Sequence, residues 1–162
     1  MKMKLVVVSD SHGKADILEE IVLKHPDAAA YLHCGDIDAP QEYYPEYTIV
    51  RGNNDLFYDY PDYRILEVGK HRIYMAHSHS FSYLHRLEQM AKTARENRCD
   101  IFCYGHTHVA KDETIDGVRL INPGSLWRSR DGRAPSYAIL TLNEENVDVE
   151  FIFLPQKKSK FF

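Results

Sequence analysis

The chain has 162 residues, 44% of them hydrophobic and 27% charged, which is an ordinary balance for one globular domain with a sizeable core. Its formal net charge of -4 argues against a protein that binds extended nucleic acid, because such proteins need broad positive potential. No apolar stretch approaches membrane-spanning length, and the run at residues 5–8 is too short for a signal-peptide core, so we expect a cytoplasmic protein with no membrane partner.

Short apolar runs and amphipathic segments alternate in the first part of the chain. The runs at residues 5–8, 29–34, 47–50 and 101–104 predict buried strands. Residues 14–25 carry apolar side chains at helical spacing and predict a helix that Pro26 ends. Residues 82–98 predict a second helix from the same spacing.

Hairpins dominate the rest of the chain. Three pairs of segments predict them: 64–68 with 72–76, 114–115 with 118–121, and 137–142 with 147–153. Gly69 suits a type II′ turn in the first pair, and Asp116-Gly117 is a strong turn sequence in the second. We therefore predict an α/β chain with mixed sheets, forming a single domain over residues 1–162 that ends in a basic tail at residues 156–162.

Polar residues that can bind metal ions follow five of the predicted strands directly. In chain order they are Asp10 and His12, then Asp36, then Asn53, then His77, and finally His106 and His108. Ligands of open α/β sheets bind beyond the carboxyl ends of the strands, so these loops can converge on one site although they are far apart in sequence.

Each of these motifs is weak by itself. Asp-x-His occurs by chance in many chains, Gly35-Asp36 could be an ordinary turn, and His77 could be a hydrogen-bonded core histidine. His106 and His108 are more informative, because alternate residues of an extended chain point the same way. Five motifs in order, each at a strand end, are much harder to explain as chance.

The motifs Asp-x-His, Gly-Asp, Gly-Asn-x-Asp, His-x-His and Gly-His-x-His together resemble those of the calcineurin-like metallophosphoesterases. The small YfcE-type phosphodiesterases are most similar in length, and their Asn-Pro-Gly-Ser motif matches residues 122–125. The resemblance runs from residue 10 to 125 by motif and to about 153 by strand pattern. It implies a four-layer αββα sandwich and phosphodiesterase activity.

The resemblance also implies a pair of divalent cations and assigns their ligands. Asp36 would bridge the pair; Asp10, His12 and His108 would complete one cation site, and Asn53, His77 and His106 the other. We expect the cations to be Mn²⁺. Because mixed nitrogen and oxygen donors do not select one metal, Ni²⁺, Co²⁺, Fe or Zn²⁺ are alternatives. A hydroxide that bridges the cations would attack phosphorus in line, without a covalent protein intermediate.

Protonation of the leaving group is less clearly assigned. Many family members have a histidine immediately after the metal-binding asparagine, but this chain has Asn54, which cannot act as a general acid near neutral pH. His79 or a metal-bound water could supply the proton instead. Asp55 matches an acidic position of the family and would orient the loop or a neighbouring histidine, unless it merely caps a turn.

Several polar residues near the end of the motif region are candidates for substrate binding. Ser125 belongs to a turn that would support the site and touch phosphate. Arg128 and Arg130 follow it, and arginine forks match phosphate oxygens, although arginines in loops are usually only solvated. The substrate would be a small phosphodiester or other phosphoester.

The remaining aromatic, cysteine and histidine residues are interpreted as structural. The tyrosine-rich stretch from Tyr43 to Tyr63 predicts packing of a long loop, with stacking on a nucleobase or a subunit contact as alternatives. The three cysteines show no paired spacing and are expected to be buried thiols in a reducing compartment. The histidines outside the metal pattern are His25, His33, His71 and His85.

Three other functions compete with this hypothesis. Some relatives of this fold are protein-interaction scaffolds with a degraded metal site, whereas the ligand set here is complete. A metallo-β-lactamase-like hydrolase would need a His-x-His-x-Asp-His cluster, which the sequence lacks, and a haloacid-dehalogenase-like phosphatase would need aspartate in place of His12. Homo-oligomers, either dimers or tetramers, are common in the resembled branch.

Overall fold

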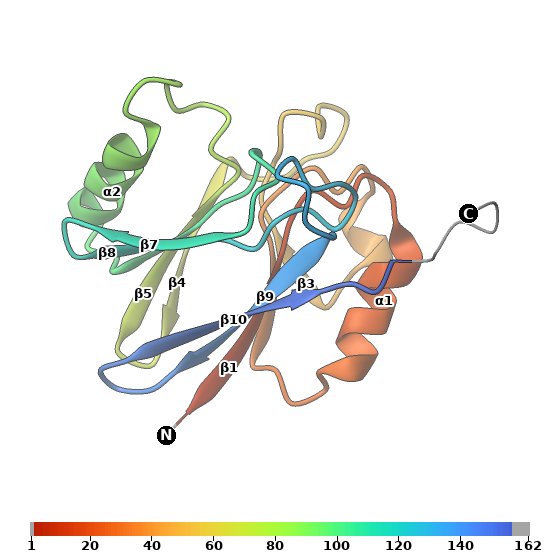
Figure 1. Ribbon diagram of the computed structural model, residues 1–162, viewed down its shortest axis with the longest axis horizontal. Coiled ribbons are helices and arrows are strands. Elements are labelled where there is room, and N and C mark those ends of the chain that lie inside the picture. Colours follow the sequence, from red (N-terminus) through yellow and green to blue (C-terminus); the bar gives the residue numbers. More distant parts are fainter. Residues whose placement is uncertain (1, 157–162) are drawn as a thin grey trace.

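The computed structural model describes residues 2–156, so the predicted basic tail lies outside the described residues from Lys157 onward. Two five-stranded sheets pack face to face, and a helix covers the outer face of each (Figure 1). This is the predicted four-layer αββα sandwich with mixed sheets, and that prediction is confirmed.

The first sheet has the order β10-β9-β1-β2-β3. Its strands are β1 (Met3–Val8), β2 (Ala30–His33), β3 (Tyr47–Ile49), β9 (Ser136–Leu142) and β10 (Val147–Phe153). The first three strands are parallel, and β9 runs antiparallel to β1 and β10. The carboxyl ends of β1, β2 and β3 therefore lie at the same end of the sandwich.

The second sheet has the order β4-β5-β6-β8-β7. Its strands are β4 (Tyr63–Val68), β5 (His71–Ala76), β6 (Ile101–Cys103), β7 (Lys111–Ile115) and β8 (Val118–Asn122). Strands β5, β6 and β8 are parallel, while β4 and β7 pair antiparallel at the two edges. The loops after β5 and β6 face those after β1, β2 and β3.

Three apolar clusters separate the layers. The cluster between the sheets includes Leu5, Val7 and Met75. Helix α1 (Ala15–Lys24) packs Leu18 and Ile21 on the first sheet. Helix α2 (Arg86–Glu96) packs Met90, Ala91 and Ala94 on the second. Because each fully buried aliphatic side chain stabilises the fold by about 1.5–3 kcal/mol, these clusters hold the four layers together.

Two predicted elements start three or more residues away from where the structure has them. The second helix begins at Arg86 rather than residue 82, because His85 has a left-handed backbone (φ 56°) and Leu84 is 69% exposed instead of packing on the sheet. Strand β7 begins at Lys111 rather than residue 114, because its pairing with β8 continues to Lys111 opposite Asn122.

The tyrosine-rich segment packs mainly into the layer under α1. Tyr44, Tyr47 and Tyr60 are buried there, and the Tyr47 hydroxyl donates to the Leu18 carbonyl at 2.9 Å. This supports the packing interpretation of the segment, although Tyr43 is 67% exposed. The three cysteines are free and buried, as predicted from their spacing.

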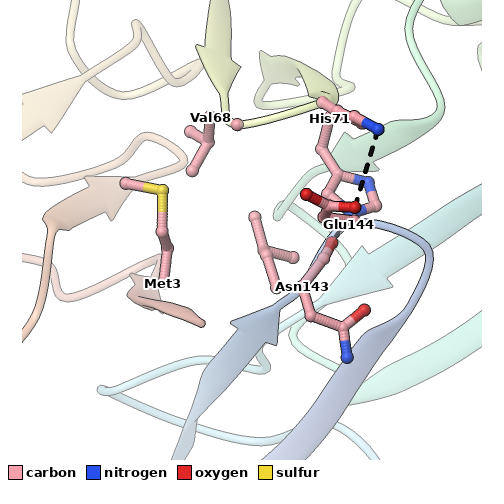
Figure 2. Close-up of a pocket in the computed structure, with 8 residues that line it drawn as sticks. Met3, Val68, His71, Asn143 and Glu144 are labelled. Carbon is pink, nitrogen blue, oxygen red and sulfur yellow. Dashed lines mark hydrogen bonds and ion pairs between the residues drawn. The ribbon is translucent and has the colours of Figure 1, made fainter. Parts of the chain in front are cut away.

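A small apolar cavity of ≈140 Å³ lies between the sheets at the end opposite the converging loops. Figure 2 shows Met3 on one side of it, Val68 and His71 on the β4–β5 hairpin, and Asn143 on the β9–β10 hairpin. The His71 ring bridges the sheets there, because its Nε2 lies 2.6 Å from the Asn143 carbonyl oxygen. Neither helix in the described part of the chain has the length and apolar character needed to cross a bilayer.

Candidate metal centre

The loops after β1, β2, β3, β5 and β6 meet at one end of the sandwich (Figure 1). These loops carry the seven predicted ligand residues. Asp10 lies at the centre of the group. Its Oδ1 is 3.2 Å from His108 Nε2, 3.7 Å from His77 Nε2 and 4.0 Å from His12 Nε2. Residues 98 positions apart in sequence thus meet at one carboxylate oxygen.

Asp36 and Asn53 occupy the other side of the same group. Asp36 Oδ2 lies 3.3 Å from His77 Nε2 and 3.8 Å from His12 Nε2. Asn53 Oδ1 lies 2.9 Å from His77 Nε2 and 3.1 Å from His106 Nδ1. Oxygen and nitrogen donors therefore face one another in pairs, as they do around a shared cation.

These residues fit divalent cations. Two buried atoms, Asp10 Oδ1 and His12 Nε2, have no hydrogen-bond partner within residues 2–156, and a buried polar atom without a partner is costly. Two triads also have their donor atoms within 4.8 Å of one another: Asp10 with His12 and His108, and Asp10 with Asp36 and His77. The resemblance gave the bridging role to Asp36, whereas in this geometry Asp10 belongs to both triads.

Hydrogen bonds behind the histidines turn their Nε2 atoms toward the centre. The Nδ1 atoms of His77 and His108 each lie 2.8 Å from a carbonyl oxygen, that of Cys34 and that of Arg128 respectively. Since a carbonyl only accepts, each Nδ1 carries the proton and leaves a lone pair on Nε2, as metal-binding histidines require. His12 Nδ1 lies 3.2 Å from Asp38 Oδ2, an acidic partner that sequence reasoning missed.

Both central carboxyl groups are held in the ionised form. Burial alone would raise the pKa of Asp10, but the nearby His108 and His77 and the Ser9 hydroxyl, which donates to Asp10 Oδ2, lower it. The pKa of Asp36 is likewise lowered against its burial, by His77 and by the Asn54 backbone N–H at 2.9 Å. The centre therefore presents two negative charges to any cation.

Two histidines of the centre have shifted pKa values of opposite sign. Burial and the nearby His77 lower the pKa of His106 to about 4, so its imidazole is neutral at pH 7. Burial would also lower the pKa of His77, but its contacts with Asp36 and Asp10 raise it. A cation that binds beside His77 therefore competes with a proton.

The backbone of the centre is unusually strained. Five ligand residues have positive φ angles: Asp10 (52°), His12 (42°), Asp36 (60°), His106 (73°) and His108 (61°). This left-handed region is uncommon for residues with a side chain, and such strain concentrates at functional sites. Its clustering here is independent support for a functional centre.

Glycine is required where the loops approach one another most closely. A Cβ atom on Gly105 would overlap Ser9 Oγ and lie 2.7 Å from Asp10 Oδ2, and one on Gly52 would overlap Asp36. These glycines let the loops of the two sheets close around the carboxylates.

The three predicted catalytic residues have different surroundings. Asn54 Nδ2 lies 3.4 Å from Asp36 Oδ2. Asn54 also lines a cavity of ≈110 Å³ beside the predicted ligands. Asp55 is fully buried and accepts N–H groups of Asp36, Asp38 and Gly52 at 2.7, 3.0 and 2.8 Å, so it orients the ligand loops. His79 is exposed, with its ring centre 5.4 Å from that of His77.

The predicted substrate-binding residues also differ in their surroundings. Ser125 is fully buried, and its hydroxyl donates to the Asp10 carbonyl at 2.8 Å and accepts the Trp127 and Arg128 N–H groups, which is a supporting role. Arg130 lies at the surface of the centre and its Nη1 is 3.3 Å from the His106 carbonyl oxygen.

Two cavities that share His108, Trp127 and Arg130 lie at the centre. The inner one, of ≈110 Å³, is lined by His12, Asp36, Asn53, Asn54, His106, His108, Trp127 and Arg130. The outer one, of ≈630 Å³, is lined by His108, Trp127, Arg128, Ser129, Arg130 and Gly132. Trp127 lines both, and sequence reasoning missed it because a lone tryptophan in a polar loop carries no pattern.

Residues 3–145 match the model of the calcineurin-like phosphoesterase superfamily domain. The chain is 34% identical over 152 residues to the probable metallophosphoesterase YsnB of Bacillus subtilis (strain 168), covering 92% of this chain and 90% of the relative.

Solved structures show the same fold. A predicted phosphoesterase from Streptococcus pneumoniae TIGR4 superposes with a TM-score of 0.88 at 28% identity, covering 94% of this chain and 90% of that one. An archaeal phosphodiesterase (TM-score 0.71, 23% identity) and YfcE, a phosphoesterase from E. coli (TM-score 0.65, 21% identity), each cover 94% of this chain and are themselves covered completely. These last two likenesses concern the fold alone.

Proposed function

The chain belongs to the calcineurin-like phosphoesterase superfamily, as its motifs predicted, and on this premise we propose that it is a phosphodiesterase that uses two divalent cations. The observation that carries the proposal is the convergence of two donor triads on Asp10, with Asp10 Oδ1 and His12 Nε2 buried and unpaired within residues 2–156. A cation at each triad would satisfy both atoms.

The ligand set divides between the two cations around the shared carboxylates. His12 and His108 lie on one side of Asp10, and His77, Asn53 and His106 lie on the side of Asp36. When bound, the cations supply activated water and neutralise the charge of the phosphate. Mn²⁺ is the proposed activator, and Ni²⁺, Co²⁺, Fe and Zn²⁺ are alternatives that this mixed donor set also suits.

Residues around the inner cavity bind and orient the phosphate. The Arg130 guanidinium and the Asn54 amide both line that cavity and can donate to phosphate oxygens. The His79 ring centre lies 5.4 Å from that of His77 and 6.3 Å from that of His106, and we assign His79 the transfer of a proton to the leaving group.

The size of the outer cavity favours a diester as substrate. A phosphate in the ≈110 Å³ inner cavity has the ≈630 Å³ outer cavity beside it, which leaves room for an esterified alcohol. A monoester without a bulky alcohol would leave that space unused.

The test is metal analysis combined with hydrolysis of bis(p-nitrophenyl) phosphate, with and without added Mn²⁺. We expect the wild type to bind cations and hydrolyse the diester, and Asp36→Asn to lose roughly 100-fold or more in rate, because a central charge is removed. Asp59→Asn is the matched control, since Asp59 is fully exposed. Equal, metal-independent rates in wild type and Asp36→Asn would refute the proposal and favour a protein-interaction scaffold.

A further inference from the structure

Trp127 presents an indole ring beside the candidate metal ligands. Its ring centre lies 4.8 Å from that of His12, at an interplanar angle of 61°, and 6.1 Å from that of His108, at 82°. The residue is nevertheless 42% exposed. A large aromatic side chain at the junction of two polar cavities, only partly covered, is available to contact a ligand.

Backbone hydrogen bonds hold Trp127 beside Asp10. The Trp127 backbone N–H donates to the Asp10 carbonyl at 3.2 Å and to Ser125 Oγ at 3.0 Å, and Ser125 is itself fully buried. The preceding Leu126 is also buried and pairs its N–H with the Ser9 carbonyl. Because these bonds join the Trp127 segment to the loop that carries Asp10, they hold the backbone of Trp127 beside the metal centre.

The outer cavity adds positive charge to this aromatic surface. Arg133 in the same loop is paired with Asp131 at 2.5 Å. By contrast, Arg128 and Arg130 line the cavity and have no carboxylate within 4.0 Å among the described residues. The volume of ≈630 Å³ lies within the range of small-molecule sites. The cavity thus combines an aromatic ring with two uncompensated guanidinium groups.

We propose that this cavity recognises a nucleoside part of the substrate, whose base stacks on Trp127 while Arg128 and Arg130 contact its anionic groups. The substrate class is then a nucleotide phosphodiester, and this inference rests on the proposed phosphodiesterase function. Because every base has a π-face, stacking on one indole gives affinity with little preference among bases.

The first test measures binding without catalysis. Trp127 is the single tryptophan of the chain, so emission excited beyond tyrosine absorption reports this ring alone. Zn²⁺-loaded protein is titrated with AMP and with ribose 5-phosphate, which carries the same phosphate without a base. We expect AMP to change the emission saturably and to bind about tenfold more tightly. Equal binding of the two ligands, or no binding of AMP, would overturn the inference.

Variants locate the effect on the ring. Trp127→Leu should bind AMP and ribose 5-phosphate equally in calorimetry, and Trp127→Phe should retain part of the preference for AMP. The control is Tyr43→Leu, which should retain the full preference because Tyr43 is exposed and lines neither cavity. Metal content is measured for each variant, because Trp127 packs on His12. If Trp127→Leu loses metal, the AMP preference of Trp127→Phe tests the proposal instead. A full AMP preference in Trp127→Leu contradicts the proposal.

Hydrolysis separates this inference from the proposed function. The p-nitrophenyl esters of thymidine 5′-phosphate and of methyl phosphate share one leaving group, and we expect about tenfold higher kcat/KM for the thymidine ester in the wild type only. Hydrolysis of both at equal kcat/KM supports the phosphodiesterase and overturns nucleoside recognition. No hydrolysis, together with preferential binding of AMP, supports nucleoside recognition and overturns the phosphodiesterase.

Discussion

At the scale of single residues, Asp38 shows how a side chain outside the ligand set can control a ligand. Its Oδ2 lies 3.2 Å from His12 Nδ1, on the side of the ring away from the centre. Its own backbone N–H is fixed by Asp55 at 3.0 Å. The carboxylate therefore selects the His12 tautomer whose Nε2 lone pair faces Asp10.

We predict that Asp38→Ala lowers cation affinity about 10–100-fold, the usual effect of removing the partner of a metal-binding histidine. Calorimetric titration with Mn²⁺ measures the affinity, and Asp59→Ala at an exposed position is the control. Asp38→Asn should lose less than Asp38→Ala, because an amide oxygen still accepts from His12. Unchanged affinity in Asp38→Ala would show that His12 needs no partner.

The sequence could identify the ligand residues and Asp55, which orients their loops, but not Asp38 or Trp127. The seven candidates stand in motifs with fixed spacing, and the structure places them together. Asp38 is 26 positions from His12, and Trp127 is brought to the centre by backbone hydrogen bonds to Asp10 and Ser125, so neither contact follows from local sequence. Ser125 itself was found by motif, but burial makes it a support for the loop.

At the scale of elements, the turn after β6 determines how closely the two sheets approach. Gly105 lies where its backbone meets Ser9 and Asp10 of the other sheet, and Gly105 itself does not have positive φ. The requirement for glycine there is therefore purely steric.

We predict that Gly105→Ala destabilises the fold by about 1–3 kcal/mol and weakens cation binding, because Ser9 and Asp10 must move. Gly117→Ala is the contrasting control. Gly117 has φ 80° but nothing within 4 Å of the added Cβ, so we expect a cost of about 1 kcal/mol and unchanged cation affinity. Chemical denaturation and metal titration check both effects. A Gly105→Ala variant with native stability and affinity would contradict the steric argument.

Elements with clear apolar patterns were predicted well, and the errors lie where the pattern misleads. Residues 82–85 continue the helical spacing of α2, yet His85 adopts a left-handed backbone and the helix starts after it. The first residues of β7 are charged and show no apolar pattern, so only pairing with β8 reveals them. In the β7–β8 turn, which the sequence predicted, Asp116 and Gly117 both have positive φ, as a type I′ turn requires.

At the scale of the whole molecule, the two ends of the sandwich differ in composition: one carries the polar metal centre and the other is apolar. The end opposite the metal centre holds a small apolar cavity, and His71 joins the sheets there (Figure 2). Its Nδ1 lies 2.6 Å from Asp100 Oδ2 and its Nε2 lies 2.6 Å from the Asn143 carbonyl oxygen. The imidazole is 6% exposed, so these contacts are not replaced easily by water.

We predict that His71→Ala lowers the free energy of unfolding by about 1–3 kcal/mol, because the Asn143 carbonyl and the Asp100 carboxylate lose their partner. Cation affinity should not change, since the two ends share no residue. Lys70→Ala, which removes only an exposed ion pair with Glu144, should cost about 0–1 kcal/mol. A change of Mn²⁺ affinity in His71→Ala would show that the ends are coupled.

The distribution of donors between the sheets has a mechanical consequence. Four of them, Asp10, His12, Asp36 and Asn53, extend from one layer, and His77, His106 and His108 extend from the other. An ion held among them would link the two sheets and stabilise the folded state against their separation at that end. At the far end, the contact of His71 with the Asn143 carbonyl joins the same two sheets.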